Sequence, residues 1–257
     1  MDQGRPASRI SPGYVAAQLK LSGCPRWSVG IVVPAQNEQA SIEPCIQSIR
    51  GSCETARLHD YWIVIVADSC TDDTLPRARR AVAGVGEVLE CDAKSAGSAR
   101  RLGVDAALAH FNDQDLRQIW LANTDADTLV PRDWITVQLK LADAGIAAVA
   151  GIVKLDDSGS PAAQELYHAT YLTRPDGTHG HVHGANLAFR ADAYVDAGGW
   201  AHRALAEDHC LWGRLKGRGW RLSSPASSVV VTSSRLIGRA RGGFADTLKA
   251  NIDAQPA

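Results

Sequence analysis

Two aspartates with one residue between them follow an apolar run near the middle of the chain. Asp125 and Asp127 come soon after "IWLA" (119–122), which is typical of a buried strand. Two carboxylates this close repel each other unless a positive charge lies between them. In an extended segment, alternate side chains project to the same side, so the pair could chelate a hard cation, for which oxygen ligands favour Mg²⁺ or Mn²⁺. In an ordinary loop, the same pair would be solvated turn residues.

Acidic and polar residues also follow other apolar runs. The run "YWIVIVA" (61–67) ends at Asp68, which is placed to accept hydrogen bonds from a base or a ribose. Capping of the next helix is the alternative role, but Asp72 and Asp73 fit that role better. The run "VGIVV" (29–33) is followed by residues that taken alone suit an ordinary turn, namely Pro34, Ala35, Asn37 and Glu38.

Another acidic pair, Glu207 and Asp208, stands at the start of a predicted helix that is defined by Leu211 and Leu215. A carboxylate at a helix N-terminus is stabilised as the anion, so helix capping is one role for this pair. The other role is that of a general base, which removes a proton from an attacking hydroxyl. Local sequence does not separate the two roles.

The elements that would carry these side chains alternate between strand and helix. Near-continuous apolar runs occur at 29–33, 61–67, 119–122, 146–153 and 228–232, and helical patterns lie between several of them. Such runs indicate strands that are covered on both faces. The order predicts an open, Rossmann-like, mostly parallel α/β sheet flanked by helices, with its site at the carboxyl ends of the strands.

Composition limits the class of protein. The chain has 257 residues, 45% of them hydrophobic, and a formal net charge of -1, so no nucleic-acid partner is expected. Residues 1–26 are expected to form a flexible arm and residues 27–257 a single domain, with a nucleotide-binding half of about 27–130 and an acceptor half of about 131–257. No run reaches the roughly 20 apolar residues of a membrane span, and no secretion signal is evident, so we expect a cytoplasmic protein whose peripheral membrane association stays open.

Five segments taken in order resemble family 2 glycosyltransferases of the GT-A fold: "VVPAQNE", "VADSCTDDT", "NTDADTLV", "HGANLAFR" and "AEDHCLWGRL". The resemblance spans about Trp27 to Arg235. It implies a hexosyltransferase that moves a sugar from a nucleotide diphosphate sugar, expected to be uridine-linked, to a hydroxyl acceptor of unknown type, with inversion. A cation would stabilise the departing diphosphate in such a transfer.

The resemblance also implies roles for particular residues. Pro34, Ala35, Asn37 and Glu38 would line the nucleoside pocket, and Asp68 would contact the base. Gly97 and Arg100 would approach the donor, although the family's usual Asn after this arginine is replaced by Arg101. Asp125 and Asp127 match the family's Asp-x-Asp, which binds the metal and the donor. Asp208, in the pair with Glu207, falls at the position of the catalytic base.

Three further features suggest binding roles. His179, His181 and His183 alternate, so in a strand they would share a face, which suits either zinc, an acceptor pocket beside Gly184 and Asn186, or a plain surface. Trp200 is expected beside a sugar. An arginine and glycine segment near the end suits either a loop closing over diphosphate or a solvated turn, and its arginines are Arg235, Arg239 and Arg241.

Two rival functions share some of these features. A sugar-phosphate nucleotidyltransferase would carry a Gly-rich, Arg-containing loop after the first strand, and "VVPAQNEQAS" has none. The same stretch has no dinucleotide-binding or Walker-type glycine pattern. A non-catalytic nucleotide-sugar-binding module would keep the same acidic residues, and only donor hydrolysis would separate it from an enzyme.

Overall fold

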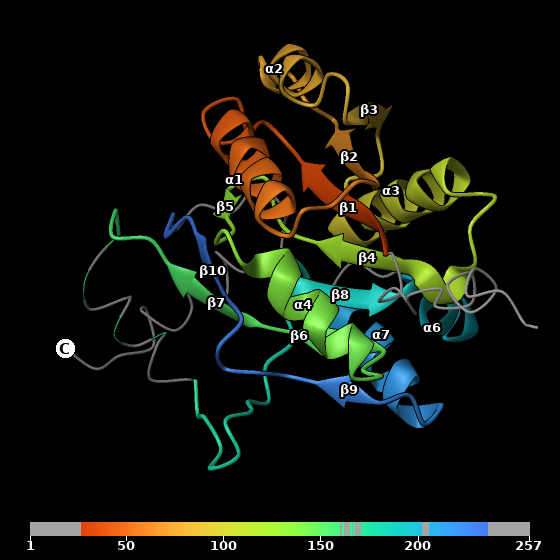
Figure 1. Ribbon diagram of the computed structural model, residues 1–257. Helices are drawn as coiled ribbons and strands as arrows, with labels where there is room; N and C mark the ends of the chain where they lie inside the picture. Colours follow the sequence, from red (N-terminus) through yellow and green to blue (C-terminus); the bar gives the residue numbers. More distant parts are fainter. Residues whose placement is uncertain are drawn as a thin grey trace, which may run out of the picture.

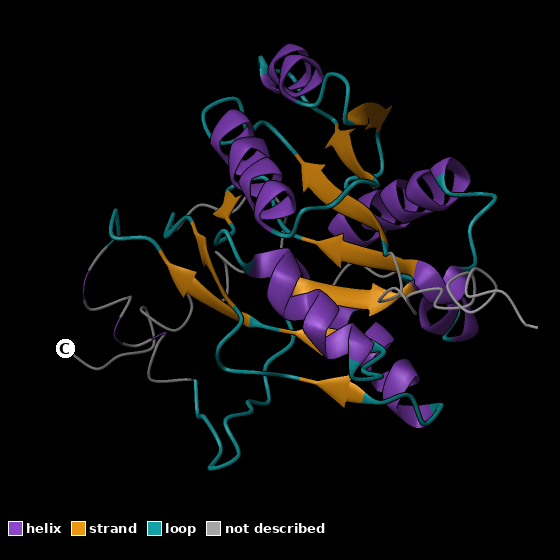
Figure 2. Cartoon of the chain, viewed as in Figure 1, coloured by secondary structure: helices purple, strands orange, loops and turns teal. Residues whose placement is uncertain are grey.

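The computed structural model describes residues 27–159, 161, 165, 167, 171–201 and 206–235. The predicted arm, residues 1–26, lies outside this part of the chain, as do Arg239 and Arg241. Figure 1 gives the element labels and Figure 2 the secondary structure. Among the described residues, no helix is long and apolar enough to cross a membrane.

The main sheet has seven strands in the order β3-β2-β1-β4-β8-β6-β9. Strands β3, β2, β1 and β4 run parallel, β8 runs antiparallel to both of its neighbours, and β9 is parallel to β6. The mostly parallel sheet predicted from the apolar runs is therefore confirmed. The strands are β1 (Ser28–Ala35), β2 (Tyr61–Asp68), β3 (Gly86–Cys91), β4 (Ile119–Asn123), β6 (Ala148–Ala150), β8 (Leu187–Arg190) and β9 (Leu222–Ser223).

Helices cover both faces of this sheet (Figure 1). One face packs against α1 (Ile42–Thr55), α2 (Thr74–Ala81) and α4 (Trp134–Asp143). The other face packs against α3 (Ala96–His110), α6 (Ala191–Asp196) and α7 (Glu207–Gly217). Along β1, Val29, Ile31 and Val33 face the first layer and Val32 faces the second, and all four side chains are fully buried. Burial on both faces explains why the run "VGIVV" is apolar without alternation.

A second sheet of three strands has the order β5-β10-β7, made of β5 (Thr128–Leu129), β10 (Val229–Thr232) and β7 (Ile152–Leu155). The run 146–153, expected as one strand, is divided between the two sheets at Gly151. A Cβ atom at Gly151 would lie 2.2 Å from Nδ2 of Asn186 and 2.5 Å from the main-chain oxygen of Ser228. The chain therefore passes from one sheet to the other where only glycine fits.

Strands β3, β5, β8 and β9 are not expected from the apolar runs of the sequence. β3 is an edge strand in which Glu90 is exposed and the other residues are partly buried. Because it includes Glu87 and Glu90, its sequence shows no continuous apolar run. β8 has four residues and directly follows a short 3-10 turn, η2 (Gly184–Asn186). Another 3-10 turn, η1 (Leu116–Gln118), directly precedes β4. Both predicted halves of the chain contribute strands to the seven-stranded sheet, and the single-domain boundary at 27–257 stays a prediction.

Candidate active site

The carboxyl ends of β2, β1 and β4 meet at one edge of the main sheet, because these three strands are parallel neighbours. Asp68 is the last residue of β2, Glu38 follows β1, and Asp125 and Asp127 follow β4. Asn37 and Ser69 both have a positive φ, 55° in each case, in the turns that leave β1 and β2. The sheet topology therefore brings the predicted acidic residues to one rim.

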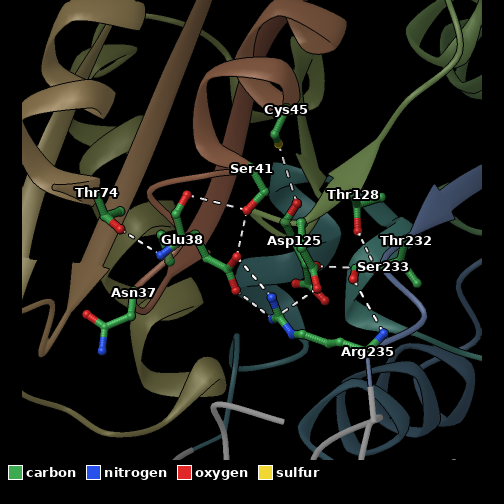
Figure 3. A network of polar contacts seen from close by, with 12 residues as sticks. Asn37, Glu38, Ser41, Cys45, Thr74, Asp125, Thr128, Thr232, Ser233 and Arg235 are labelled. Carbon is green, nitrogen blue, oxygen red and sulfur yellow. Dashed lines mark hydrogen bonds and ion pairs between the residues drawn. The ribbon is translucent and has the colours of Figure 1, made fainter. Parts of the chain in front are cut away.

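Arg235, just beyond β10, forms ion pairs with both Glu38 and Asp127. Figure 3 shows its guanidinium beside Glu38. Its Nη1 donates to Oε2 of Glu38 over 3.0 Å, and its Nη2 lies 2.5 Å from Oε1 of Glu38 and 2.9 Å from Oδ2 of Asp127. Thr232, on the same strand, donates to Oδ1 of Asp127 over 3.2 Å. Arg235, which follows β10, thus supplies part of the positive charge that offsets the repulsion between Asp125 and Asp127.

Asp127 lies in an environment that disfavours its ionised form. Burial raises the pKa of this carboxyl from its ordinary 3.8 to about 6; Arg235 opposes the shift, and Asp125 and Glu38 add to it. The same three carboxylates act electrostatically on the thiol of Cys45 and raise its pKa further, in addition to the larger effect of burial. This thiol donates to the main-chain oxygen of Asp125 over 3.4 Å (Figure 3). A further cation beside Asp127 would therefore be stabilised by this unbalanced charge.

Arg100 bridges the aspartate pair to the helix α7. Its Nη2 lies 2.6 Å from Oδ1 of Asp125 and its Nη1 lies 2.7 Å from Oε1 of Glu207. The Arg100 side chain is 5% exposed and the Glu207 side chain 13% exposed. The first residue of α7 is therefore tied to the loop after β4.

Asp208, the next residue of α7, is held by main-chain donors. Its Oδ2 accepts from the N–H of Gly184 over 3.1 Å, and its Oδ1 accepts from the N–H of His209 over 2.7 Å. Asp208 also acts electrostatically on Arg100 and on His183. It therefore lies close to both the arginine bridge and the histidine segment.

Asp68 holds the loop that precedes α3. Its Oδ1 accepts from the N–H of Lys94 over 2.9 Å and its Oδ2 from the N–H of Ser95 over 3.0 Å. Ser95 in turn caps α3 by accepting from the N–H of Ser98. Nucleotide recognition by Asp68 stays a prediction, as it does for Pro34, Ala35 and Asn37, and the Asn37 side chain accepts from the N–H of Thr71.

His179, His181 and His183 gather around Tyr171. The rings of His181 and His183 are stacked with centroids 5.8 Å apart, and Tyr171 lies 4.2 Å from the ring of His181. Burial lowers the pKa of His183 to about 4, partly opposed by Asp208. Burial also lowers the pKa of His179. Among the described residues, no group of three or more His, Cys, Asp or Glu side chains is arranged to hold a metal ion, so the zinc interpretation has no ligand set there.

Two residues expected near an acceptor or a sugar are core residues instead. Trp200 is fully buried between helices and sheet, 5.5 Å from the Arg100 guanidinium, so its ring has no exposed face for a sugar. Asn186 is 2% exposed, and its amide accepts from Trp134 and donates to the main-chain oxygens of Ile152 and Ser228. Gly184 does reach the site, through its N–H bond to Asp208.

The donor set fits a divalent cation that arrives together with phosphate. Mg²⁺ commonly binds one or two protein carboxylates plus substrate phosphates, so two aspartates are enough and a complete protein cage is not needed. All the candidate ligand atoms are carboxylate oxygens, which suit Mg²⁺ or Mn²⁺. The carboxylates outnumber the guanidinium groups that balance them: Glu38, Asp125, Asp127, Glu207 and Asp208 against Arg100 and Arg235.

Sequence reasoning missed two polar contributors to this site. Thr232 belongs to the apolar run 228–232 in the sequence but contacts Asp127, and Cys45 contacts the main-chain oxygen of Asp125. The signal for Thr232 is its position, since it is the last residue of its strand and the first polar one after Val229, Val230 and Val231.

Solved structures with the same architecture define the fold of this chain as GT-A. The mannosyltransferase PcManGT from Pyrobaculum calidifontis, solved in complex with GDP-Man and Mn²⁺, matches with a TM-score of 0.62 and 22% identity over 84% of this chain and 59% of that one. TarS 1–349 from S. aureus, solved with UDP-GlcNAc, matches with a TM-score of 0.62 and 14% identity over 84% of this chain and 61% of that one. The chain thus spans about three-fifths of either structure.

The family follows from sequence. The model of glycosyl transferase family 2 matches residues 30–196, and the chain belongs to this family. A search of the curated proteins finds no match. The family and the fold predicted from the five ordered segments are therefore both confirmed.

Proposed function

We propose that the protein is an inverting, metal-assisted glycosyltransferase that moves a sugar from a nucleotide diphosphate sugar to a hydroxyl acceptor. The observation that carries the proposal is the meeting of three separate acidic segments at one rim: Glu38 after β1, the Asp125 and Asp127 pair after β4, and the pair at the start of α7. Membership of glycosyl transferase family 2 supports the reaction class.

The donor would bind along the ends of β1, β2 and β4. In this proposal Asp68 and the residues that follow β1 contact the nucleoside, and Arg235 exchanges its contact with Glu38 and Asp127 for one with the diphosphate. The uridine-linked donor is favoured from the sequence resemblance, while PcManGT was solved with a guanosine-linked one and TarS with a uridine-linked one. A hexose is the sugar we propose.

Asp125 and Asp127 would hold Mn²⁺ or Mg²⁺, which when bound supplies positive charge to the departing diphosphate. The chain's own contribution is orientation. Thr232 contacts Oδ1 of Asp127, and Arg100 contacts Oδ1 of Asp125. Oδ2 of Asp127 contacts Arg235, and in this proposal it becomes available to the ion when Arg235 turns to the diphosphate. PcManGT was solved with Mn²⁺.

Asp208 would act as the general base. Glycosyl transfer passes through an oxocarbenium-like state, and a base on the opposite face from the leaving group takes the acceptor's proton as the new bond forms. The two main-chain N–H groups that donate to Asp208 fix its direction and leave its remaining lone pairs for a proton. With the base on that face, a single displacement would invert the anomeric carbon.

Calorimetry with UDP and Mn²⁺, combined with hydrolysis of a UDP-sugar panel, tests the proposal. Asp127→Ala should abolish Mn²⁺-dependent UDP binding. Asp208→Asn should keep this binding and lose donor hydrolysis by a factor on the order of 10². Asp113→Asn, at an exposed aspartate beyond α3, is the matched control and should behave as wild type.

Normal donor hydrolysis by Asp208→Asn would overturn the base assignment. Tight UDP binding without any hydrolysis by the wild type would favour a non-catalytic nucleotide-sugar-binding module. Release of pyrophosphate from a sugar phosphate and a nucleoside triphosphate would instead favour a nucleotidyltransferase.

A further inference from the structure

We propose that Arg100 is a positioning residue that sets the place of Asp208 through its ion pair with Glu207, and that Glu207 is therefore part of the support and not the base. The inference rests on the proposed role of Asp208 as the base. It assigns to Arg100 a task inside the protein, in place of the contact with the donor that the sequence resemblance implies.

The two ion pairs of Arg100 join segments from opposite sides of the site. Nη2 contacts Asp125 over 2.6 Å, and Nη1 contacts Glu207 over 2.7 Å. With a side chain only 5% exposed, the guanidinium has both terminal nitrogens committed to protein carboxylates. A planar guanidinium holds two carboxylates in a fixed relation, which a lysine ammonium does not.

Packing around Arg100 leaves little freedom to move. A Cβ atom at Gly184 would lie 2.4 Å from Cζ of Arg100, and a Cβ atom at Gly97 would lie 2.9 Å from Cγ of Glu207. On another side, the Arg100 guanidinium lies 5.5 Å from the centre of the Trp200 ring, which is itself fully buried. Two glycines and a tryptophan therefore enclose the pair of Arg100 and Glu207.

The start of α7 depends on contacts with other elements. Its N-cap residue, Ala206, has a φ of 57°, a conformation that costs a residue with a side chain of order 1 kcal/mol or more, and it makes no side-chain cap. In place of a cap, Glu207 is held by Arg100 from α3, and Asp208 accepts from the N–H of Gly184. Without the ion pair between Arg100 and Glu207, the hydrogen bond from the N–H of Gly184 to Asp208 would be the remaining polar contact among the described residues that holds the start of α7 from outside the helix.

Glu207 is poorly suited to be the base. One of its oxygens is occupied by Arg100, and its side chain is 13% exposed. Within the described part of the chain, Asp208 receives only main-chain hydrogen bonds and forms no ion pair with a guanidinium. Glu207 is therefore the supporting residue of the pair, and Asp208 is the reacting one.

Amide hydrogen exchange and donor hydrolysis together test this inference. In Glu207→Ala and Arg100→Met, the amides that donate to the start of α7, those of Gly184 and Cys210, should exchange on the order of tenfold faster. Both variants should lose donor hydrolysis at saturating UDP-sugar by a factor on the order of 10², since misplacement of a reacting group by about 1 Å has that effect. For Glu207→Ala, the dissociation constant of UDP with Mn²⁺ should stay within about threefold of wild type.

Conservative variants separate positioning from chemistry. Glu207→Gln keeps an oxygen that accepts from Arg100, so it should retain most of the hydrolysis rate, and Arg100→Lys should recover part of it. The double variant Arg100→Met with Glu207→Ala should be no slower than the slower single variant, because both changes remove the same contact. Arg101→Met, next to Arg100 and donating to the main-chain oxygen of Trp200, is the matched control.

Three results would overturn the inference. They are a Glu207→Gln variant as slow as Asp208→Asn, an Arg100→Met variant that loses UDP affinity but keeps its saturated rate, and unchanged exchange at α7 in Glu207→Ala. If wild type neither bound UDP nor hydrolysed any donor, the proposed function would fail. The exchange measurement would still decide whether the bridge positions α7, so the two failures are distinguishable.

Discussion

Asp127 is subject to opposing electrostatic effects. Its carboxylate contacts Arg235 over 2.9 Å, yet burial and two neighbouring carboxylates raise its pKa to about 6. Arg235 therefore reduces the unfavourable charge at this position without removing it. A buried carboxylate with this balance binds a cation more readily than a fully paired one would.

The pH dependence of stability should reveal this balance in the metal-free protein. The folded pKa of Asp127, about 6, lies above the ordinary 3.8, so the folded state holds this proton more tightly than the unfolded state. The stabilising contribution is present below pH 4 and is lost as the pH rises through 6. Urea unfolding should show Asp127→Asn gaining stability relative to wild type by on the order of 2 kcal/mol between pH 4 and pH 7.5.

The control for that measurement is Asp113→Asn, whose difference from wild type should not change over the same range. A constant difference for Asp127→Asn would mean that Arg235 neutralises Asp127 completely. Excess Mn²⁺ with UDP should remove the wild-type loss above pH 6 if the ion binds the ionised carboxylate.

At the scale of residues, the sequence predicts the acids of the site better than their partners. Asp125, Asp127 and Asp208 stand out because they follow a buried strand or open a helix. Arg100 and Arg235 are also singled out, as donor-binding candidates, but the sequence does not show which carboxylates they pair with. Arg235 pairs with a residue 197 positions earlier in the chain, and such a contact follows only from the three-dimensional arrangement of the strands.

Helix α3 positions Arg100 by packing closely on the main sheet. A Cβ atom at Gly103 would lie 2.4 Å from Cγ1 of Val32 and 3.1 Å from Cγ2 of Val66. A Cβ atom at Gly30, on β1, would lie 2.9 Å from Cβ of Ala107 on the same helix. Glycine at these two positions lets α3 approach β1 and β2, which sets the depth of its N-terminal turn.

Gly103→Ala should therefore destabilise the protein although alanine is the better helix former. Overpacking against Val32 costs about 1–3 kcal/mol, which exceeds the helix propensity gain of roughly 0.5–1 kcal/mol. Gly51→Ala in α1 is the matched control, because nothing lies within 4 Å of its added Cβ, and it should stabilise. Urea unfolding of both variants measures the difference, and a stability gain in Gly103→Ala would contradict close packing as the constraint on α3.

At the scale of elements, apolar runs predict strands well where both faces are buried. The predicted runs 29–33, 61–67 and 119–122 all lie within β1, β2 and β4, because the side chains of these strands are almost all buried. β3 is missed because it is an edge strand with polar side chains. The run 146–153 gives one expected strand and two observed ones, since an apolar pattern does not show that Gly151 diverts the chain into a second sheet.

The whole molecule joins two sheets whose strands come from distant parts of the chain. β10 lies parallel to β7 and antiparallel to β5, so residues 229–232 lie beside the loop that carries Asp125 and Asp127. Strand pairing of this kind is not readable from one sequence, although the resemblance to family 2 glycosyltransferases anticipates the fold as a whole. The site lies where the two sheets meet, so ligand binding there should stabilise the whole fold against unfolding.

Thermal unfolding should therefore show cooperation between metal and nucleotide. At a ligand concentration a hundred times the dissociation constant, binding stabilises the folded state by about 2.7 kcal/mol. For a chain of this size, that is a rise in Tm on the order of 5–10 °C. Because Asp125 and Asp127 offer too few ligands to hold the ion alone, Mn²⁺ or UDP separately should raise Tm by less, and together they should exceed the sum of the separate shifts. Asp127→Ala should lose the part of the Tm shift that exceeds this sum. Repeating the measurement with GDP in place of UDP tests the nucleotide preference. A full Tm shift from Mn²⁺ alone would contradict a metal site that is completed by substrate phosphate.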